Sequence, residues 1–211
     1  MKKQLAKLAL TAAIGLALTF TQAAATPLTD SRDKKTYKTV KIGEQVWMAE
    51  NLNYEAKGSK CGGTNIQTAE GEEGTFTYST LEDKNTANCD KYGRLYDGET
   101  VAKACPSGWH LPSDKEWQTL VDFAGGNDKA GVKLKAAKFG GTDNFGFSAL
   151  SGGDGDNTGN FLNVGEEGYW WSSTETPGHS AYCWKMLSNF EFVERIDMVK
   201  LYFLSVRCIK D

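Results

Sequence analysis

Five cysteines that follow an N-terminal export signal constrain this 211-residue chain more than any other feature. Residues 1–25 carry lysines at positions 2, 3 and 7, continue as an apolar run from Leu8 to Phe20 and end on the small residue Ala25. This is the pattern of a cleaved secretory signal. The apolar run is short for a bilayer core of about 30 Å, so a retained anchor is the weaker alternative. We expect export to the periplasm, the outer surface or the medium, where cysteines oxidise.

All five cysteines lie in the expected mature chain, and an odd number leaves one thiol over. We predict disulfides Cys61–Cys89 and Cys105–Cys208. In a chain-entropy model the second, which closes a loop of ~100 residues, stabilises the fold by about 4 to 5 kcal/mol. Cys183 is then a free thiol, buried in a strand, and a reactive thiol is the alternative.

Charge and metal-ligand content limit the partners. The expected signal carries three lysines and no acidic residue, so its removal takes the formal net charge from −3 to −6. Such a chain lacks the basic stripe that nucleic-acid binding needs. The two histidines and the lack of a Cys-x-x-Cys pair argue against a structural zinc site. No second apolar stretch is long enough to cross a membrane, so the mature chain should have no transmembrane segment.

Local patterns predict a polar lead-in at residues 26–35 and a single domain over residues 36–211. Alternation at 36–42 and 45–48, with Gly43-Glu44 between them, predicts a hairpin. Residues 55–90 are polar and glycine-rich, which is typical of a long surface excursion. We expect this excursion to be pinned at its ends by Cys61 and Cys89, and to be followed by a short strand at 92–96.

Two helices are expected in the middle of the chain. Ser113 and Glu116 have the spacing of a capping box, and apolar residues then recur at helical intervals until Gly125. A shorter helix is expected over Lys129–Lys138. Residues 139–168 read mainly as loop, and the last expected segments, at 181–187, 191–198 and 203–210, follow one another closely as an antiparallel meander. The expected fold class is therefore α+β, with two central helices, antiparallel strands and many long loops.

Five stretches together resemble the Fibrobacter succinogenes major paralogous domain (FISUMP) over nearly all of residues 30–211. Their sequences are VWMAENLNY at 46–54, YGRLY at 92–96, ACPSGWHLPSDKEW at 104–117, GYWWSSTE at 168–175 and SVRC at 205–208. The resemblance implies an exported bacterial protein without an established activity. It also implies a distant similarity to C-type lectin-like folds, including the domain of formylglycine-generating enzyme.

The functional residues of those distant folds are missing here. The calcium- and sugar-binding tripeptides of lectins are absent, and so is the paired-cysteine active site of the oxidase. Neither activity is carried over, because a shared fold does not imply a shared function. No Gly-x-Ser-x-Gly elbow occurs, and no motif selects a pair of carboxylates for glycoside hydrolysis. We expect a protein that is not an enzyme, with an uncharacterised hydrolase as an alternative.

The segment that begins at Asp154 offers oxygen ligands at short intervals, since Asp156 and Asn157 follow closely. Calcium binds six to eight oxygens in such loops. The same residue types also build ordinary turns, which is the simpler interpretation. The expectation is therefore no cofactor, with calcium at Asp154, Asp156 and Asn157 as the exception to test.

Six tryptophans and eight tyrosines are many for one domain. Trp170 and Trp171 are neighbours in an expected strand, so they point to opposite faces, and one of them should be exposed or covered by a loop. A flat ring beside Asp and Asn side chains suits the binding of a sugar. The alternative is that the rings simply fill the core.

These observations favour an exported, non-catalytic module that binds a polysaccharide or another cell-surface component. Its candidate ligand-binding residues are Trp170, Trp184, Asp154, Asp156 and Asn157. The alternative is a structural or protein-interaction module of the cell envelope.

Overall fold

The computed structural model describes residues 25–71 and 74–211. The first 24 residues of the expected export signal lie outside this part of the chain. Within it, no helix combines the length and the apolar character needed to cross a bilayer.

Short strands dominate the described residues and pair into four sheets. The strand orders are β1–β2, β3–β4–β14–β8, β11–β12–β13 and β5–β7–β10–β9, with β6 paired to β7. The strands are β1 (Leu28–Thr29), β2 (Thr36–Tyr37), β3 (Thr39–Ile42), β4 (Gln45–Met48), β5 (Cys61–Gly62), β6 (Gln67–Gly71), β7 (Gly74–Glu82), β8 (Trp109–His110), β9 (Asp154–Gly155), β10 (Asn160–Leu162), β11 (Glu167–Thr176), β12 (Ser180–Leu187), β13 (Glu194–Val199) and β14 (Ile209–Lys210).

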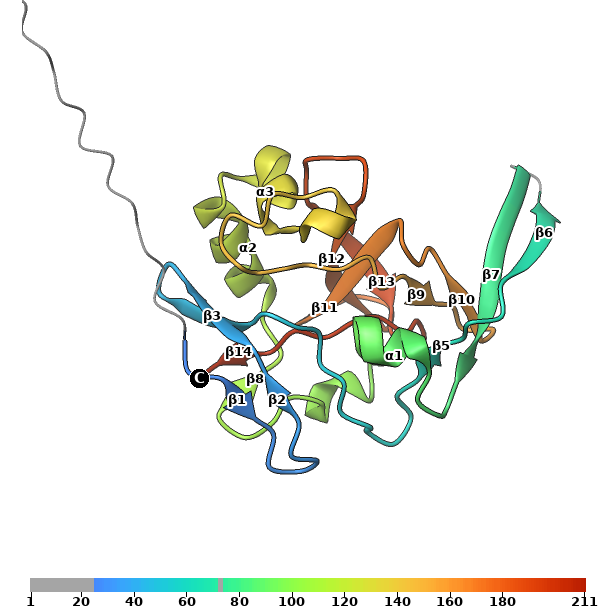
Figure 1. Cartoon of the computed structure of the whole chain (residues 1–211), viewed down its shortest axis with the longest axis horizontal. Helices are drawn as coiled ribbons and strands as arrows, with labels where there is room; N and C mark the ends of the chain where they lie inside the picture. Colours follow the sequence, from blue (N-terminus) through green and yellow to red (C-terminus); the bar gives the residue numbers. More distant parts are fainter. Residues whose placement is uncertain (1–24, 72–73) are drawn as a thin grey trace, which may run out of the picture.

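The described residues contain three short α-helices, α1 (Ala87–Tyr92), α2 (Asp114–Phe123) and α3 (Asn127–Leu134), and 3₁₀ turns at 101–103 and 137–139. The expected α+β, C-type-lectin-like domain with two central helices is therefore wrong, because the protein is mostly β-sheet. Helices α2 and α3 lie beside each other, away from the ribbon of β6 and β7 that projects from the body (Figure 1).

The error has a physical source in two stretches, 55–90 and 139–168, that read as loops. They contain β5, β6, β7, β9 and β10, several of which are only two or three residues long. Strands this short show no clear alternation of apolar and polar residues. Their hydrogen bonds come from partners distant in sequence, as in the pairing of Phe161 with Ser79. Single-sequence patterns cannot report such partners.

Elements with local signals form as predicted. β3 and β4 pair in the expected register around Gly43-Glu44, with Gly43 in the left-handed region at φ +60°. The capping box is complete, since the Ser113 hydroxyl accepts from the Glu116 backbone N–H and the Glu116 carboxylate accepts from the Ser113 backbone N–H. The helix it starts, α2, buries Trp117.

The expected strand at 92–96 and the expected last meander differ from the structure. Residues 92–96 contribute only isolated bridges, such as that between Tyr96 and Leu204. The antiparallel meander is formed by β11, β12 and β13. The final segment instead crosses to the N-terminal hairpin, where Ile209 pairs with Trp47 of β4 and with His110 of β8. The polar lead-in is also ordered, since it takes part in the β1–β2 pair.

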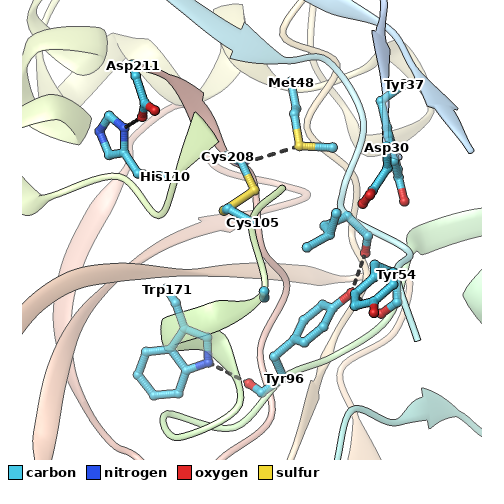
Figure 2. The surroundings of a disulfide bond; sticks show 12 residues. Asp30, Tyr37, Met48, Tyr54, Tyr96, Cys105, His110, Trp171, Cys208 and Asp211 are labelled. Atoms are coloured by element: carbon cyan, nitrogen blue, oxygen red, sulfur yellow. Dashed lines mark hydrogen bonds and ion pairs between the residues drawn. A yellow bond between two sulfur atoms is a disulfide. The ribbon is translucent and has the colours of Figure 1, made fainter. Parts of the chain in front are cut away.

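Both predicted disulfides form. Cys61 and Cys89 join the two ends of the 55–90 excursion, and Cys105 and Cys208 join the middle of the chain to the last strand (Figure 2). Beside the second bridge, the Cys208 backbone N–H contacts the Met48 sulfur at 3.4 Å. Cys183 is a buried free thiol, as expected, and burial raises its pKa far above the ordinary value.

Candidate functional site

The stretches that carry the family resemblance meet in the interior around Asn51. The Asn51 side-chain oxygen accepts from Trp170 Nε1 and from Arg207 Nε, each at 2.9 Å. Its Nδ2 donates to the Tyr92 carbonyl at 2.8 Å and to the Ser205 hydroxyl at 3.3 Å. Four of the five resemblance stretches are therefore joined by one buried amide, which identifies these residues as builders of the core.

Arg207 completes this buried network and is fully shielded from water. Its guanidinium donates to the carbonyls of Phe147 and Ser148 and lies 4.3 Å from the centre of the Phe147 ring. Burial lowers the pKa of Arg207 to about 9, so it remains a cation at neutral pH. Each of its three nitrogens donates to a partner inside the fold, which is the behaviour of a structural residue.

Trp170 and Trp184, expected to face a ligand, are fully buried in the core. They pair across β11 and β12, and each packs near Trp117, at centroid distances of 6.3 and 6.1 Å. Trp171 points to the opposite face of β11, as expected, but that face is covered as well. There the Trp171 Nε1 donates to the Tyr96 carbonyl (Figure 2). Neither neighbour is exposed, because each face of β11 carries its own hydrophobic cluster.

The three residues expected to bind calcium differ in their exposure to solvent and in their hydrogen-bond partners. Asp154 is buried, whereas Asn157 is exposed. The Asp156 carboxylate closes its own turn by accepting from the backbone and side-chain groups of Thr158 and Asn160, at 2.7 to 2.9 Å. Burial acts to raise the pKa of Asp156, but these hydrogen bonds outweigh it and lower the pKa. In residues 25–71 and 74–211, no group of three His, Cys, Asp or Glu side chains is placed to hold a metal ion.

His110 lies at the end of β8 with a half-exposed ring. Its Nε2 lies 2.9 Å from Glu116 Oε1, and its Nδ1 lies 2.7 Å from Asp211 Oδ1 (Figure 2). Both ring nitrogens therefore face carboxylates, and the ring ties the chain end to the start of α2.

Sequence reasoning missed the β6–β7 ribbon, which projects from the body (Figure 1). Its register places Phe76 opposite Ala69 and Tyr78 opposite Gln67, so the two rings share one face. The ring centroids are 5.9 Å apart, Phe76 is 46% exposed, and the Tyr78 hydroxyl lies 3.1 Å from Gln67 Oε1. The alternating run Thr-Phe-Thr-Tyr at 75–78 was the available strand signal.

A groove of about 380 Å³, which we call the ribbon groove, separates this ribbon from the body. Phe76, Tyr78 and the exposed Ile66 line one wall. The opposite wall comes from β10 and the turn after it, where Asn163 and Glu166 supply polar groups. The groove therefore combines aromatic rings with an amide and a carboxylate. Among its described lining residues there is no lysine or arginine.

Asn163 holds the turn on the polar wall. Its backbone is left-handed at φ +58°, a conformation that Asn adopts more readily than most residues. Its carbonyl accepts from the backbone N–H groups of Glu166 and Glu167, at 3.1 and 3.0 Å. Its side-chain Nδ2 donates to Asp154 Oδ1 at 2.7 Å. Asp154, one of the residues predicted for the site, is thus connected to this groove by its hydrogen bond with Asn163.

Comparison with known proteins gives one result for this chain. Searches of curated proteins and of solved structures return no match. The model of the family described as Fibrobacter succinogenes major domain matches residues 40–210. This range contains every stretch on which the resemblance was predicted. The chain therefore belongs to the Fibrobacter succinogenes major domain family.

Proposed function

We propose that this protein is an exported, non-catalytic binding module that holds a carbohydrate of the cell wall or cell surface in the ribbon groove. The observation that supports this function is the ring pair of exposed Phe76 and half-buried Tyr78, which lines the same groove as Asn163 and Glu166. Aromatic faces pack against the C–H groups of a sugar ring, and amide and carboxylate groups pair with its hydroxyls.

The proposal includes export of the protein out of the cytoplasm. Two disulfides join distant parts of the chain, which is compatible with an oxidising periplasmic or extracellular environment. The expected cleavage after Ala25 supplies the route. Detection of the mature N-terminus at Thr26 in the exported fraction would support this part.

The chemistry of the groove favours holding a glycan over cleaving it. Most glycoside hydrolases use two carboxylates placed on either side of the scissile bond. Glu166 is the only carboxylate on the described lining of the ribbon groove. A hydrolase remains the alternative, and release of reducing sugar that Glu166→Gln abolishes would support it.

Affinity electrophoresis in gels containing soluble glycans tests the proposed function. We expect the wild-type protein to be retarded by at least one glycan, and Phe76→Ala and Tyr78→Ala to be retarded less. Phe190→Ala is the matched control, because Phe190 is 50% exposed, also pairs with a second ring, that of Phe192, and does not line the groove. Normal migration of the folded wild-type protein on every glycan would count against the proposal, as would equal losses in Phe76→Ala and Phe190→Ala.

The burial of the tryptophans supports a second candidate, a structural or protein-interaction module of the envelope. Trp47, Trp117, Trp170, Trp171 and Trp184 are fully buried, so they serve the core. If this candidate is right, the ribbon variants change the capture of an envelope protein and leave migration in every glycan gel unchanged.

A further inference from the structure

Asp154 lies behind the polar wall of the ribbon groove and is 5% exposed. It belongs to β9, which pairs with β10 immediately before Asn163. Among the described residues, its side chain makes one hydrogen bond, from Asn163 Nδ2 at 2.7 Å. The groove residue and the buried carboxylate are therefore directly coupled.

The charged groups that face Asp154 leave it without a cation in contact. Asp156 of the β9–β10 turn and Glu167 of β11 repel its charge, and Lys185 of β12 attracts it. Lys185 Nζ is engaged by Glu167 at 3.1 Å. The same Glu167 carboxylate also accepts a hydrogen bond from the hydroxyl of Tyr169. Burial is the main cause of the raised pKa values of Tyr169 and the Cys183 thiol, and the negative charge of Asp154 adds to both.

Burial raises the pKa of Asp154 to about 6. The hydrogen bond from Asn163 and the charge of Lys185 act against this rise, while Glu167 and Asp156 add to it. The carboxyl group of Asp154 therefore changes its protonation state around pH 6, within the pH range that exported proteins encounter.

The hydrogen-bonding capacity of a carboxyl group depends on that state. An ionised carboxylate only accepts, so Asn163 must present its NH₂ group to Asp154 and its Oδ1 remains available to a ligand. A protonated carboxyl also donates, so it can bond to Oδ1 and allow the amide to turn over. The protonation state of Asp154 then decides which end of the Asn163 amide faces the groove.

We propose that Asp154 is a positioning residue of the ribbon groove, which while ionised holds Asn163 Oδ1 available to a ligand hydroxyl and on protonation releases the amide. This inference rests on the proposed function, because it assigns a regulator to the same groove. The effect of losing one well-placed hydrogen bond is a change in affinity of about two- to tenfold. Affinity is therefore expected to fall by that factor between pH 7.5 and pH 5.

The direct test is a pH titration of the ligand-free protein by NMR, following the side-chain amide of Asn163. We expect an inflection near the pKa of Asp154 in the wild type and its loss in Asp154→Asn, which keeps the volume and an acceptor oxygen. The matched control is Asp156→Asn, a nearby carboxylate engaged by its own turn, and it should retain the inflection. An Asn163 amide that shows no inflection in the wild type overturns the inference.

Binding measurements with laminarin and soluble starch, at pH 7.5 and pH 5, form the second arm. The inference requires that the wild type weakens at pH 5 and that folded Asp154→Asn binds with one pH-independent, lower affinity. Equal pH dependence in the wild type and Asp154→Asn contradicts the inference and leaves the proposed function intact. If the wild type binds neither glucan at pH 7.5 or at pH 5, the result counts against the proposed function. The NMR titration then still decides whether Asp154 is coupled to Asn163.

Discussion

Single buried residues organise the interior of this protein. Asn51 makes four hydrogen bonds with residues distant in sequence, two as donor and two as acceptor, and Arg207 adds a fully buried cation to the same network. A buried polar network stabilises a fold only when every member has its partner. Removal of one member therefore leaves the others buried without partners.

The first prediction concerns Arg207→Met. The carbonyls of Phe147 and Ser148 and the amide oxygen of Asn51 would lose a donor, so the free energy of unfolding should fall by about 1–3 kcal/mol. Urea unfolding followed by tryptophan fluorescence measures the change. Arg195→Met is the control, since Arg195 is a half-exposed member of an ion pair with Asp114 and its loss should change stability by less than about 1 kcal/mol. Similar losses in the two variants would contradict a structural role for Arg207.

The second prediction concerns the pH dependence of stability at His110. Burial acts to lower the pKa of His110, but the hydrogen bonds to Asp211 and Glu116 outweigh it and raise the pKa above 6.5. A raised folded-state pKa stabilises the fold below 6.5, and the stabilisation is lost as pH rises through the folded-state value. The pKa of Glu116 is lowered from 4.5, so its contribution is lost only under more acidic conditions.

The wild type should therefore exceed His110→Gln in stability most clearly near pH 5.5, and the difference should shrink above pH 7. Because the His110 ring is 42% exposed, solvent screening keeps the effect below about 1 kcal/mol. Urea unfolding of both proteins at pH 5.5 and pH 8 measures it. A difference that grows with pH would show that the carboxylates do not stabilise the protonated ring.

The residue pattern predicted correctly which face of a strand a side chain occupies, but not whether that face is buried. The strand period correctly placed Trp170 and Trp171 on opposite faces. It could not reveal that Trp117 covers one face and that Tyr96 receives the hydrogen bond on the other. The residues that bury each face are distant in sequence, and a single sequence does not reveal which residues they are.

At the scale of elements, the sequence was informative where the signal is local. The β3–β4 hairpin and α2 form where a turn and a capping box predict them. The β9–β10 pair was missed because its strands are short and because glycine and aspartate are common in loops. The ribbon is a local hairpin, and its alternating run at 75–78 was overlooked within a polar, glycine-rich stretch. The candidate groove lies between these missed elements, so none of its lining residues was anticipated, and only Asp154, behind its polar wall, was among the predicted site residues.

The third prediction concerns the ribbon as an element. Isolated two-stranded ribbons are marginally stable in water, and most residues of β6 and β7 at 67–77 are exposed. Replacement of residues 67–77 by a short Gly-Ser link should leave the melting temperature within a few degrees of the wild-type value, because the link removes little core. The shortened protein should lose glycan retardation. Global unfolding of this variant would show that the ribbon supports the body.

At the scale of the whole molecule, the two disulfides close long loops of the chain, and Cys105–Cys208 lies beside the pair of β8 and β14. Cys105–Cys208 spans 103 residues and Cys61–Cys89 spans 28. Although five cysteines with one left over allow fifteen pairings, the formation of disulfides itself was predictable from the expected export. The β-rich architecture was not, since it depends on the assembly of many short strands.

The fourth prediction compares the two bridges. In the chain-entropy model, the longer loop contributes about 4.7 kcal/mol and the shorter about 3.6 kcal/mol. Replacement of Cys105 and Cys208 by serine should therefore lower the melting temperature more than the same replacement of Cys61 and Cys89. Calorimetry of the two double variants measures this order, and the reverse order would show that local packing outweighs loop closure. Cys183→Ser provides a variant that breaks no bridge.

The central claim is that the tryptophans and the resemblance stretches build the body, while the ligand contacts the ribbon groove. The most direct measurement is NMR shift mapping of the folded protein during titration with a glycan that retards it in a gel. The account predicts that the largest shifts gather at residues 66–78 and 161–166, with the amides of Asn51 and Arg207 unchanged. Shifts centred on any other surface, with the ribbon groove unperturbed at saturation, would contradict it.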